Sequence, residues 1–284
     1  MRYQKTVIVS GCSSGLGREI ARSLKVRGWH VFATARKDSD VENLVQEGFD
    51  AMQLDVDSSE SIRHATGLLL KACGGSLGAL VNNAGFTQIG AVEDLSRETL
   101  RKQFETNFFG PIELTNTLIP LFRRQGYGRI VFIASSDNNG FAFPMLGAES
   151  ASKNALVSVC TALRRELWGT NIHVSYVCPG ALHTRIMQKA LQELPMGIAV
   201  ETSAQRQRYE KMIPFFARSA QGSRGDEVRR TAKVVCSLLE SRKPKVRVVV
   251  PFSTKLHFWA HRHLTERVLD FLLWCKMKFV YKIL

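Results

Sequence analysis

The sequence predicts an α/β fold in which a doubly wound parallel sheet of seven strands carries helices on both faces. Short β-branched runs alternate with segments that have a helical period of about 3.6 residues. The expected strands are apolar on both sides, which is typical of a parallel sheet between two helical layers. The 284 residues, 45% of them hydrophobic and 23% charged, suffice for a sizeable core. Such sheets bind their ligands at the carboxyl ends of the strands.

Seven runs along the chain are predicted to be strands. They are KTVIVS (5–10), HVFATA (30–35), AMQLD (51–55), ALVNN (79–83), RIVFIAS (129–135), IHVSYVC (172–178) and KVRVVV (245–250). Helical periodicity fills the intervals, for example at 14–28, 97–124 and 151–167. Because parallel strands are joined by right-handed crossovers, this alternation predicts one domain over residues 1–250.

Two segments depart from the alternation. Residues 182–225 form a long insertion after the sixth strand, and we expect a substrate lid there, beside the strand ends. Residues 251–284 follow the last strand as a basic and apolar extension with six Lys/Arg, two acids and three histidines. We expect the extension to cover the substrate mouth or a twin subunit. The alternative is an interfacial helix on an anionic bilayer, and no metal site is predicted.

The first predicted strand leads into a glycine-rich turn and a helix, in VIVSGCSSGLGREIA. Gly11 allows a tight turn, while Gly15 and Gly17 allow close approach of a pyrophosphate and close packing of helix on strand. The free N–H groups at a helix start favour a phosphate. Three glycines alone are more often a simple turn, but the strand–loop–helix context predicts a dinucleotide site in a Rossmann fold.

The end of the second strand favours NADP(H) over NAD(H). Arg36 and Lys37 follow directly, where NAD-preferring enzymes usually carry an acid that binds the ribose hydroxyls. A guanidinium suits a 2′-phosphate instead. A solvated basic loop is the other interpretation of this pair.

An ordered set of short motifs resembles the short-chain dehydrogenase/reductase family, and most closely its members acting on hydroxysteroids and retinoids. The resemblance covers about residues 5–250. The motifs are SGCSSGLG, LDVD (54–57), NNAG (82–85), TNFFG (106–110), ASS ending at Ser136, ASK ending at Lys153, and PG (179–180) followed by Thr184.

The resemblance implies roles for individual residues. Ser136 would polarise the substrate oxygen, Asn107 would hold a water in the proton relay, and Lys153 would bind the nicotinamide ribose and lower the pKa of its neighbour. The implied cofactor-binding residues are Gly11, Ser13, Ser14, Gly15, Leu16, Gly17, Arg36, Lys37, Asp55, Val56, Asn82, Ala84, Gly85, Lys153, Pro179, Gly180 and Thr184.

Glu149 departs from the family pattern, because the family carries a proton-transferring tyrosine four residues before the lysine. A phenol with a pKa near about 10 can be tuned toward neutrality, whereas a carboxylic acid starts near about 4.3. Lys153 lies one helical turn later and favours the ionised carboxylate. Unless burial raises its pKa, Glu149 is therefore expected to be ionised at neutral pH. It would then be unable to donate a proton and would be a weak base.

Three explanations for Glu149 stay open. The residue is a natural loss, or a working variant whose proton path runs through Lys153, Ser136 and water, or an engineered substitution. The first interpretation of the chain is an NADP(H)-dependent oxidoreductase that moves hydride between nicotinamide and a hydrophobic alcohol or carbonyl of steroid, retinoid or lipid-like class. The alternative is a non-catalytic NADP(H)-binding scaffold or sensor that also contacts a membrane.

Composition limits the compartment and the partners. Six scattered cysteines without a C-x-x-C pair favour a reducing compartment, and the start of the chain runs into a strand rather than a signal peptide. We expect a cytoplasmic protein, with peripheral membrane contact as an option, and no spanning helix. The net charge of +14 fits solubility, an anionic cofactor or an anionic membrane. No nucleic-acid motif is found, and the family likeness implies a homodimer or homotetramer.

Overall fold

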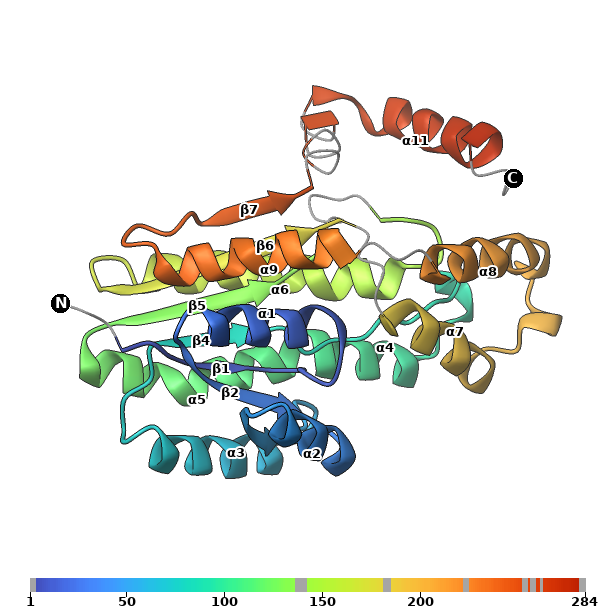
Figure 1. Cartoon of the computed structure of the whole chain (residues 1–284). Coiled ribbons are helices and arrows are strands. Elements are labelled where there is room, and N and C mark those ends of the chain that lie inside the picture. The colour runs from blue at the N-terminus through green and yellow to red at the C-terminus, as the bar shows by residue number, and fades with distance from the viewer. Residues whose placement is uncertain are drawn as a thin grey trace.

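A computed structural model describes residues 4–135, 142–180, 185–221, 225–251, 255, 259–260 and 263–280. Its seven strands form one sheet in the order β3-β2-β1-β4-β5-β6-β7, and every neighbouring pair is parallel (Figure 1). The strands are β1 (Thr6–Val9), β2 (His30–Ala35), β3 (Asp50–Gln53), β4 (Ala79–Asn82), β5 (Gly128–Ile133), β6 (Ile172–Pro179) and β7 (Arg247–Val250). The predicted doubly wound sheet is confirmed.

Helices cover both faces of this sheet. They are α1 (Gly15–Val26), α2 (Asp38–Gln46), α3 (Ser59–Ala72), α4 (Arg97–Phe104), α5 (Gly110–Gln125), α6 (Gly147–Glu166), α7 (Arg185–Gly197), α8 (Arg206–Gln221), α9 (Gly225–Glu240) and α11 (Glu266–Cys275). Short turns of 3-10 or π helix are η1 (Val92–Asp94), η2 (Glu105–Phe109), η3 (Val200–Thr202) and η4 (Lys276–Val280).

Two apolar clusters lie on opposite sides of the sheet because successive strand residues point to opposite faces. In β1, Val7 and Val9 enter the cluster formed with α1, α2 and α9, while Ile8 enters the cluster formed with α3, α5 and α6. The helices meet the sheet through residues one turn apart, as Ile20 and Leu24 of α1 do. Both faces are therefore buried, which is why the strands lack polar alternation.

A third apolar cluster lies beyond the carboxyl ends of the strands. It joins residues on either side of η1 and at the start of α6 to α7 and α8, and it takes in Met277 of η4. We name residues 185–221, which hold α7, η3 and α8, the lid segment. The insertion predicted at 182–225 thus contains its own helices and a core separate from those of the sheet; its role as a lid stays a prediction.

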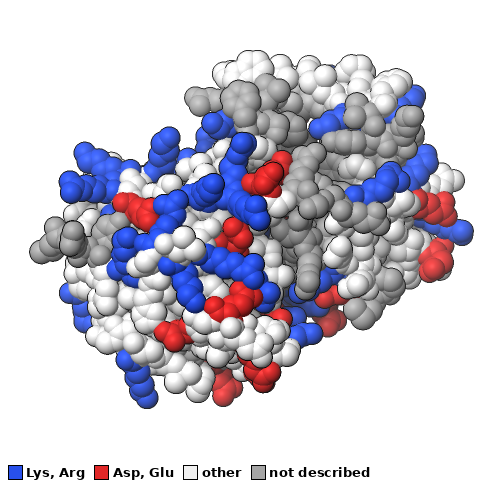
Figure 2. All heavy atoms as spheres, viewed as in Figure 1, with Lys and Arg blue, Asp and Glu red and all other residues white. Residues whose placement is uncertain are grey.

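The surface carries the excess of positive charge that the sequence indicates. Figure 2 shows Lys and Arg gathered over α1 and α9, where Arg22, Lys25, Arg229, Arg230 and Lys233 are exposed. All six cysteines are free thiols, and five of them are buried. Among the described helices, none has the length and apolar character needed to cross a membrane.

Candidate active site

A cavity of about 500 Å³ opens where the strands end. Its walls come from the loops after β1, β2, β3, β4, β5 and β6 and from the lid segment. The predicted residues that line it are Gly11, Ser13, Ser14, Gly15, Leu16, Gly17, Arg36, Lys37, Asp55, Val56, Ala84, Gly85, Glu149, Lys153, Pro179 and Gly180. Residues from widely separated motifs therefore share one cavity, as expected for the end of a doubly wound sheet.

The glycine turn is shaped by close backbone contacts. Gly11 has a φ of +71°, and a Cβ there would lie 2.9 Å from Ala84 Cα. A Cβ on Gly17 would lie 2.3 Å from the Gly11 carbonyl oxygen and 2.4 Å from Asn83 Nδ2. Any side chain at either position would push the loops apart. The missing side chains leave the first N–H groups of α1 facing the cavity, and these groups favour an anion.

Asn83 binds the glycine turn to the loop after β4. Its Nδ2 donates to the carbonyls of Ser10 (2.9 Å) and Gly11 (3.0 Å). The hydroxyl of Ser10 in return accepts from the backbone N–H groups of Asn83 and Ala84, both at 3.0 Å. Asn83 was not among the predicted cofactor-binding residues, which included the neighbouring Asn82.

The position of Asn82 differs from the prediction. Its side chain is buried and its amide donates to the Thr115 hydroxyl of α5 at 2.8 Å, so Asn82 does not line the cavity. The physical reason is strand alternation: Asn82 ends β4 facing α5, and the next residue faces β1. Asn82 therefore binds a helix on one side of the sheet, whereas Asn83 binds the glycine turn.

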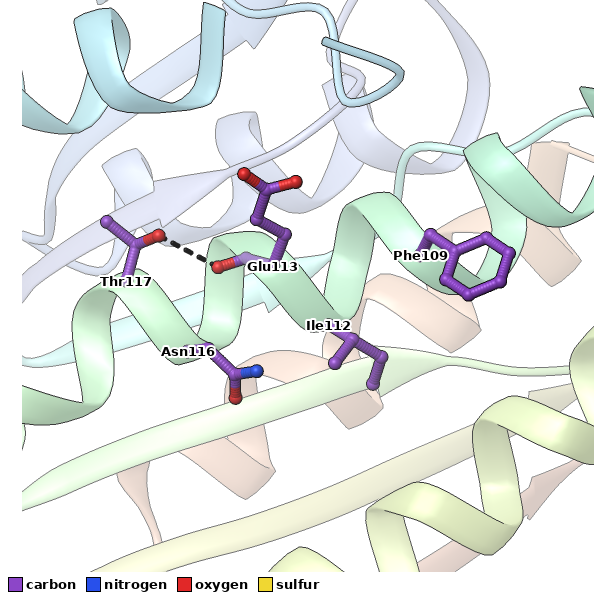
Figure 3. A pocket seen from close by; sticks show the side chains of 5 residues that line it. All are labelled: Phe109, Ile112, Glu113, Asn116 and Thr117. Atoms are coloured by element: carbon purple, nitrogen blue, oxygen red, sulfur yellow. Dashed lines mark hydrogen bonds between the residues drawn. The ribbon is translucent and has the colours of Figure 1, made fainter. Parts of the chain in front are cut away.

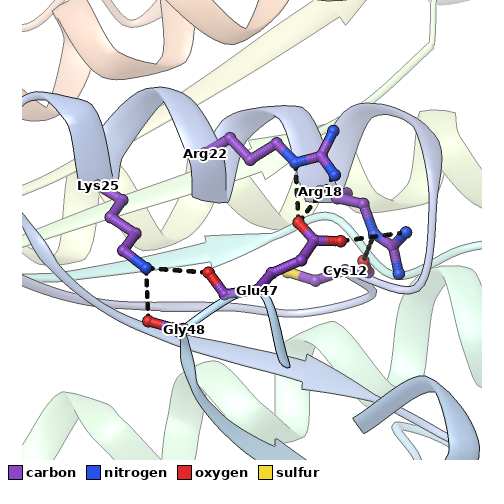
Figure 4. Close-up of polar contacts among 6 residues, drawn as sticks. All are labelled: Cys12, Arg18, Arg22, Lys25, Glu47 and Gly48. Carbon is purple, nitrogen blue, oxygen red and sulfur yellow. Dashed lines mark hydrogen bonds and ion pairs between the residues drawn. The ribbon is translucent and has the colours of Figure 1, made fainter. Parts of the chain in front are cut away.

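A polar network on the outer side holds α1 to the end of α2 (Figure 4). The carboxylate of Glu47 pairs with Arg22 at 2.8 Å and with Arg18 at 3.5 Å. Arg18 also donates through Nε to the Cys12 carbonyl at 3.2 Å. This network fixes the far side of the glycine turn, whose near side faces the cavity.

Charged groups surround the end of the cavity beyond β2 and β3. Arg36 and Lys37 are exposed there, and no acid lies directly after β2. Burial raises the pKa of Asp57, while the hydroxyl of Thr106, which donates to it at 2.9 Å, acts in the opposite direction. The basic pair suits a phosphate group on a ribose, and the residues of this end and of the glycine turn fit a dinucleotide.

Lys153 and Glu149 lie one turn apart on α6 at the inner end of the cavity. Only 8% of Lys153 is exposed, and its Nζ donates to the Ile133 carbonyl at 3.0 Å. Burial lowers the pKa of Lys153, although the Glu149 carboxylate acts to raise it. Glu149 is half-buried and lines the cavity. The Lys153 ammonium also approaches Gly85, where a Cβ would lie 3.4 Å from Nζ.

Asn107 lies behind the cavity wall rather than in it. It is fully buried in η2, the π-helical turn that joins α4 to α5. Its Oδ1 accepts from Phe86 N at 3.0 Å, and its Nδ2 donates to the Phe86 carbonyl at 3.0 Å and the Ser152 hydroxyl at 3.2 Å. Ser152 donates onward to the Glu149 carbonyl at 2.7 Å. Asn107 thus connects the turn that carries Glu149 to the loop after β4. Ser152 lies within the ASK motif but was not among the predicted site residues.

Ser136 and Thr184, two further predicted site residues, lie outside the described residues. Ser135, next to the first, lines the cavity. Several lining residues were not among the predicted site residues. Asp57, Asn83 and Thr106 lie inside the quoted motifs but were passed over, whereas no motif marks Lys102, Phe143 and Met187.

Aromatic side chains of the lid segment and of the chain before α6 line one end of the cavity. Phe143, before α6, stacks on Phe215 of α8 with ring centroids 5.9 Å apart and contacts Phe216 edge-on at 6.3 Å. All three rings line the cavity. This end therefore offers an apolar surface beside Glu149 and Lys153, which suits an apolar substrate.

Polar links attach the lid segment to the rest of the chain both around η1, where Ser203 also donates to Asp94, and at α4. The hydroxyl of buried Tyr209 donates to Asp94 Oδ2 and accepts from Ala91 N, each at 2.8 Å. Burial raises the pKa of Tyr209 to about 12, which keeps the hydroxyl a donor. At the cavity mouth, Lys102 and Glu193 form an exposed ion pair at 3.8 Å. The Tyr209 hydroxyl is buried, whereas the Lys102–Glu193 ion pair is open to solvent.

A separate shallow hollow lies on α5, away from the cavity. Phe109, Ile112, Glu113, Asn116 and Thr117 line it (Figure 3). The Phe109 ring is exposed at its rim.

Comparisons with known proteins give one consistent family. The family model described as short chain dehydrogenase matches residues 5–195. The uncharacterized oxidoreductase YbbO of Escherichia coli (strain K12) is 41% identical over 189 residues, 66% of this chain and 70% of that protein. Retinol dehydrogenase 8 of Homo sapiens is 32% identical over 255 residues, 86% of this chain and 80% of that protein.

Solved structures share the whole fold. A short-chain dehydrogenase from Streptomyces avermitilis matches with a TM-score of 0.76 and 28% identity, covering 96% of this chain and 97% of its own. An actinorhodin polyketide ketoreductase solved with NADPH matches with a TM-score of 0.70 and 26% identity, covering 87% and 95%. A Burkholderia phymatum relative solved with NAD, at 20% identity and a TM-score of 0.76, shares the fold.

Proposed function

This chain belongs to the short chain dehydrogenase family, and on that premise we propose that it is an NADP(H)-dependent oxidoreductase with an impaired proton-transfer residue. Its substrate is a hydrophobic alcohol or carbonyl of steroid, retinoid or lipid-like class. One observation carries the proposal: a single cavity joins the glycine turn, the Glu149–Lys153 pair and an aromatic cluster. A cofactor, a proton-handling pair and an apolar substrate would meet there.

The chain's residues divide the work of holding the cofactor, which exchanges a hydride with the substrate carbon when bound. The first turn of α1, from Gly15 to Gly17, offers N–H groups to the pyrophosphate. Asp55 and Val56 would flank the adenine, and Ala84 and Gly85 would give room along the central path. Lys153 would hold the nicotinamide ribose, while Pro179, Gly180 and Thr184 would orient the ring.

Arg36 sets the preference for NADP(H). Its guanidinium binds the 2′-phosphate, with Lys37 as a second cation. In an Arg36→Ala variant, titration calorimetry should show NADPH affinity about tenfold lower, with NADH affinity unchanged. Equal losses for both cofactors, or none for either, would contradict this role.

The proton step is where Glu149 limits the reaction. Reduction of a carbonyl requires a proton for the oxygen that Ser136 polarises, and an ionised Glu149 has none to donate. A residual path runs from Lys153 through water, because burial favours loss of the lysine proton. Ionised Glu149 remains a weak base for the opposite direction, alcohol oxidation.

The test compares this chain with its Glu149→Tyr variant. Restoring a phenol should raise kcat/KM for NADPH-dependent reduction of apolar ketones and aldehydes by about 100-fold, the usual contribution of a general acid. The Glu149→Gln variant is the matched control, because it removes the charge without supplying a phenol. Absence of any gain for the tyrosine variant across a carbonyl panel would count against the proposed mechanism.

A non-catalytic role is the second candidate, and the carboxylate at position 149 is the observation that favours it. In that case the chain binds NADP(H) as a scaffold or sensor and passes the state of the cofactor to a partner. Both candidates predict NADPH binding, but only the first predicts consumption of NADPH with substrate. Absorbance of NADPH during incubation with substrate separates them.

We further propose a cytoplasmic homodimer or homotetramer. The hollow on α5 with exposed Phe109 supports an interface through α5 and α6 (Figure 3). The free cysteines suit a reducing compartment. Light scattering of wild type and a Phe109→Ser variant tests the interface, since the variant should lower the mass to that of a monomer.

A further inference from the structure

The C-terminal helical segment, α11 with η4 (266–280), has apolar residues on two opposite sides. On the inner side, Leu273 packs against the lid cluster and Met277 is 4% exposed within it. On the outer side, Val268, Phe271, Leu272 and Phe279 are 43–67% exposed. We name these four residues the outer stripe. They recur at intervals of three, four and seven positions, so that they share one side of the helix.

The outer stripe needs an explanation because a surface helix ordinarily buries one apolar side and solvates the other. Elsewhere on the described surface, exposed apolar residues are scattered, as with Val26, Val92 and Trp168. Four large side chains on one short helix, with the half-exposed Trp274 beside them, form a continuous patch instead. Such patches mark sites that bind another surface.

Charge is sorted around the outer stripe. Arg267 and Lys278 lie along one edge and Lys276 along the other, by helical position. The two acids, Glu266 and Asp270, precede Leu273 by seven and three positions and therefore share the inner side. Cations beside an apolar stripe, with acids turned away, are complementary to an anionic apolar boundary.

Lys278 shows how a cation fits this edge. Its Nζ lies 4.8 Å from the Trp274 ring centroid and 5.7 Å from that of Phe279. The ammonium therefore lies over the two aromatic rings, which places a positive charge directly beside the apolar surface. In Figure 2 the region of α11 is mostly uncharged, with Lys and Arg at its edges.

We propose that the outer stripe docks this protein on the surface of an anionic phospholipid bilayer, with α11 lying in the plane of the interface. The ten residues of α11 are too short to span a bilayer, which needs about 20. Partial burial of Phe271, Leu272 and Phe279 among acyl chains supplies apolar contact. Arg267, Lys276 and Lys278 meet lipid phosphates and carboxylates.

A bilayer suits this surface better than a second copy of the chain. A two-fold interface would bring the same patch against itself, so the cations at the edges of the outer stripe would face like charges. The net charge of +14 adds repulsion between copies and attraction to anionic lipid.

Docking would place the lid segment at the membrane surface. Met277 enters the cluster that contains Phe216, and the Phe216 ring lines the cavity. A substrate dissolved in the bilayer would then reach the cavity beside the lid segment. Delivery of a substrate depends on the proposed function, whereas docking does not.

The test is flotation of the full chain with vesicles. Wild type should float with phosphatidylcholine vesicles that contain about 30% phosphatidylserine and should not float with phosphatidylcholine alone. Added salt should weaken binding, because exposed charges are screened. A Phe271→Ser/Phe279→Ser double variant should lower the partition coefficient about tenfold or more. The matched control is Trp168→Ser, which removes an aromatic side chain that is 80% exposed outside α11 and should leave binding unchanged.

Three results would overturn docking. These are no flotation of wild type with anionic vesicles, equal flotation of the double variant, or a dimer in lipid-free solution that the double variant converts to monomer. The last result would mean that a second copy covers the outer stripe. NADPH titration of the same samples checks folding and keeps the two proposals separate, since a chain that floats without binding NADPH would contradict only the proposed function.

Discussion

The glycine turn and the lid segment bound the same cavity but are held in different ways. The glycine turn is fixed by backbone: Asn83 binds two carbonyls, and neither Gly11 nor Gly17 has room for a Cβ. The lid segment is fixed by side chains, through its own apolar cluster and the Tyr209–Asp94 link. A wall made of backbone tolerates few substitutions, whereas a wall made of side chains is adjustable by repacking.

This difference separates the part of the cavity proposed to bind the cofactor from the part proposed to bind the substrate. A dinucleotide is constant, so its cradle is rigid and continuous with the sheet. Substrates differ, so the apolar end is built on a unit whose core lies apart from those of the sheet. Substitutions on the two sides should therefore separate cofactor affinity from substrate affinity, and four variants test that separation.

The largest effect is expected from Gly17→Ala. The new Cβ would lie 2.3 Å from a carbonyl oxygen and would separate the glycine turn from Asn83. NADPH affinity in titration calorimetry should fall about 100-fold, equivalent to about 2.7 kcal/mol. The control is Gly67→Ala in α3, where a Cβ meets nothing within 4 Å and the melting temperature should hold or rise. Unchanged NADPH affinity in Gly17→Ala would contradict the idea that close backbone contacts fix the cofactor side of the cavity.

Lys153→Met tests the region of the cavity between the glycine turn and the lid segment. Turnover should fall at least about tenfold, because the proposed ribose contact and the proposed proton path both depend on Lys153. Stability gives a second readout. Burial lowers the lysine pKa from about 10.5, so between the lowered value and 10.5 the unfolded chain binds more protons.

The unfolding free energy of wild type should therefore rise with pH in that window, by up to about 1.4 kcal/mol per pH unit, relative to the methionine variant. Denaturant titrations at several pH values between 7 and 10 measure the difference. A difference that stays flat would show that the pKa of the buried lysine is unshifted, and a difference that falls would show that the pKa is raised; either result contradicts the expected lowering.

Tyr209→Phe tests the lid segment alone. Loss of the hydroxyl leaves the buried Ala91 N–H without its partner, which costs about 1–3 kcal/mol of unfolding free energy, while Asp94 keeps the hydrogen bond from Ser203. KM for an apolar substrate should rise severalfold while NADPH affinity stays unchanged. Tyr127→Phe, whose hydroxyl binds Ser76 at 2.9 Å, is the matched control and should leave KM unchanged. A parallel loss of NADPH affinity in Tyr209→Phe would mean that the two sides are not separable.

The smallest effect is expected from Glu193→Gln. The Lys102–Glu193 ion pair is 3.8 Å long, with 60% and 42% of the two side chains exposed. Exposed pairs of this kind contribute less than about 1 kcal/mol, and salt screens them. KM should therefore change less than about threefold, and that change should disappear at high salt. A larger, salt-independent change would assign this pair a direct contact with substrate.

The sheet and the glycine turn could be predicted from the sequence because their signals are local. Strands of a parallel sheet are short apolar runs, and the turn at Gly11 lies between one strand and one helix. The lid network could not be predicted in this way. Tyr209 and Asp94 are 115 residues apart, and no spacing rule connects them.

Strand facing, rather than the motif itself, decides which residues of the candidate site line the cavity. The NNAG motif indicated Asn82, but alternation at the end of β4 turns Asn83 toward the glycine turn. The Asn107 side chain binds Phe86 and Ser152, and its part in a proton relay stays a prediction. Motifs identify which residues gather at a strand end, while packing decides which of them faces the cavity.

The hydrogen bonds from Asn83 to Ser10 and Gly11 span more than 70 residues of chain. During synthesis, the first βαβ unit can therefore exist before the nucleotide cradle does. The cradle is completed only when β4 has emerged and paired with β1. Coenzyme added to a growing chain would then stabilise intermediates in which β4 has paired with β1 and leave earlier intermediates unaffected. Stabilisation by coenzyme would therefore report when this part of the sheet is complete.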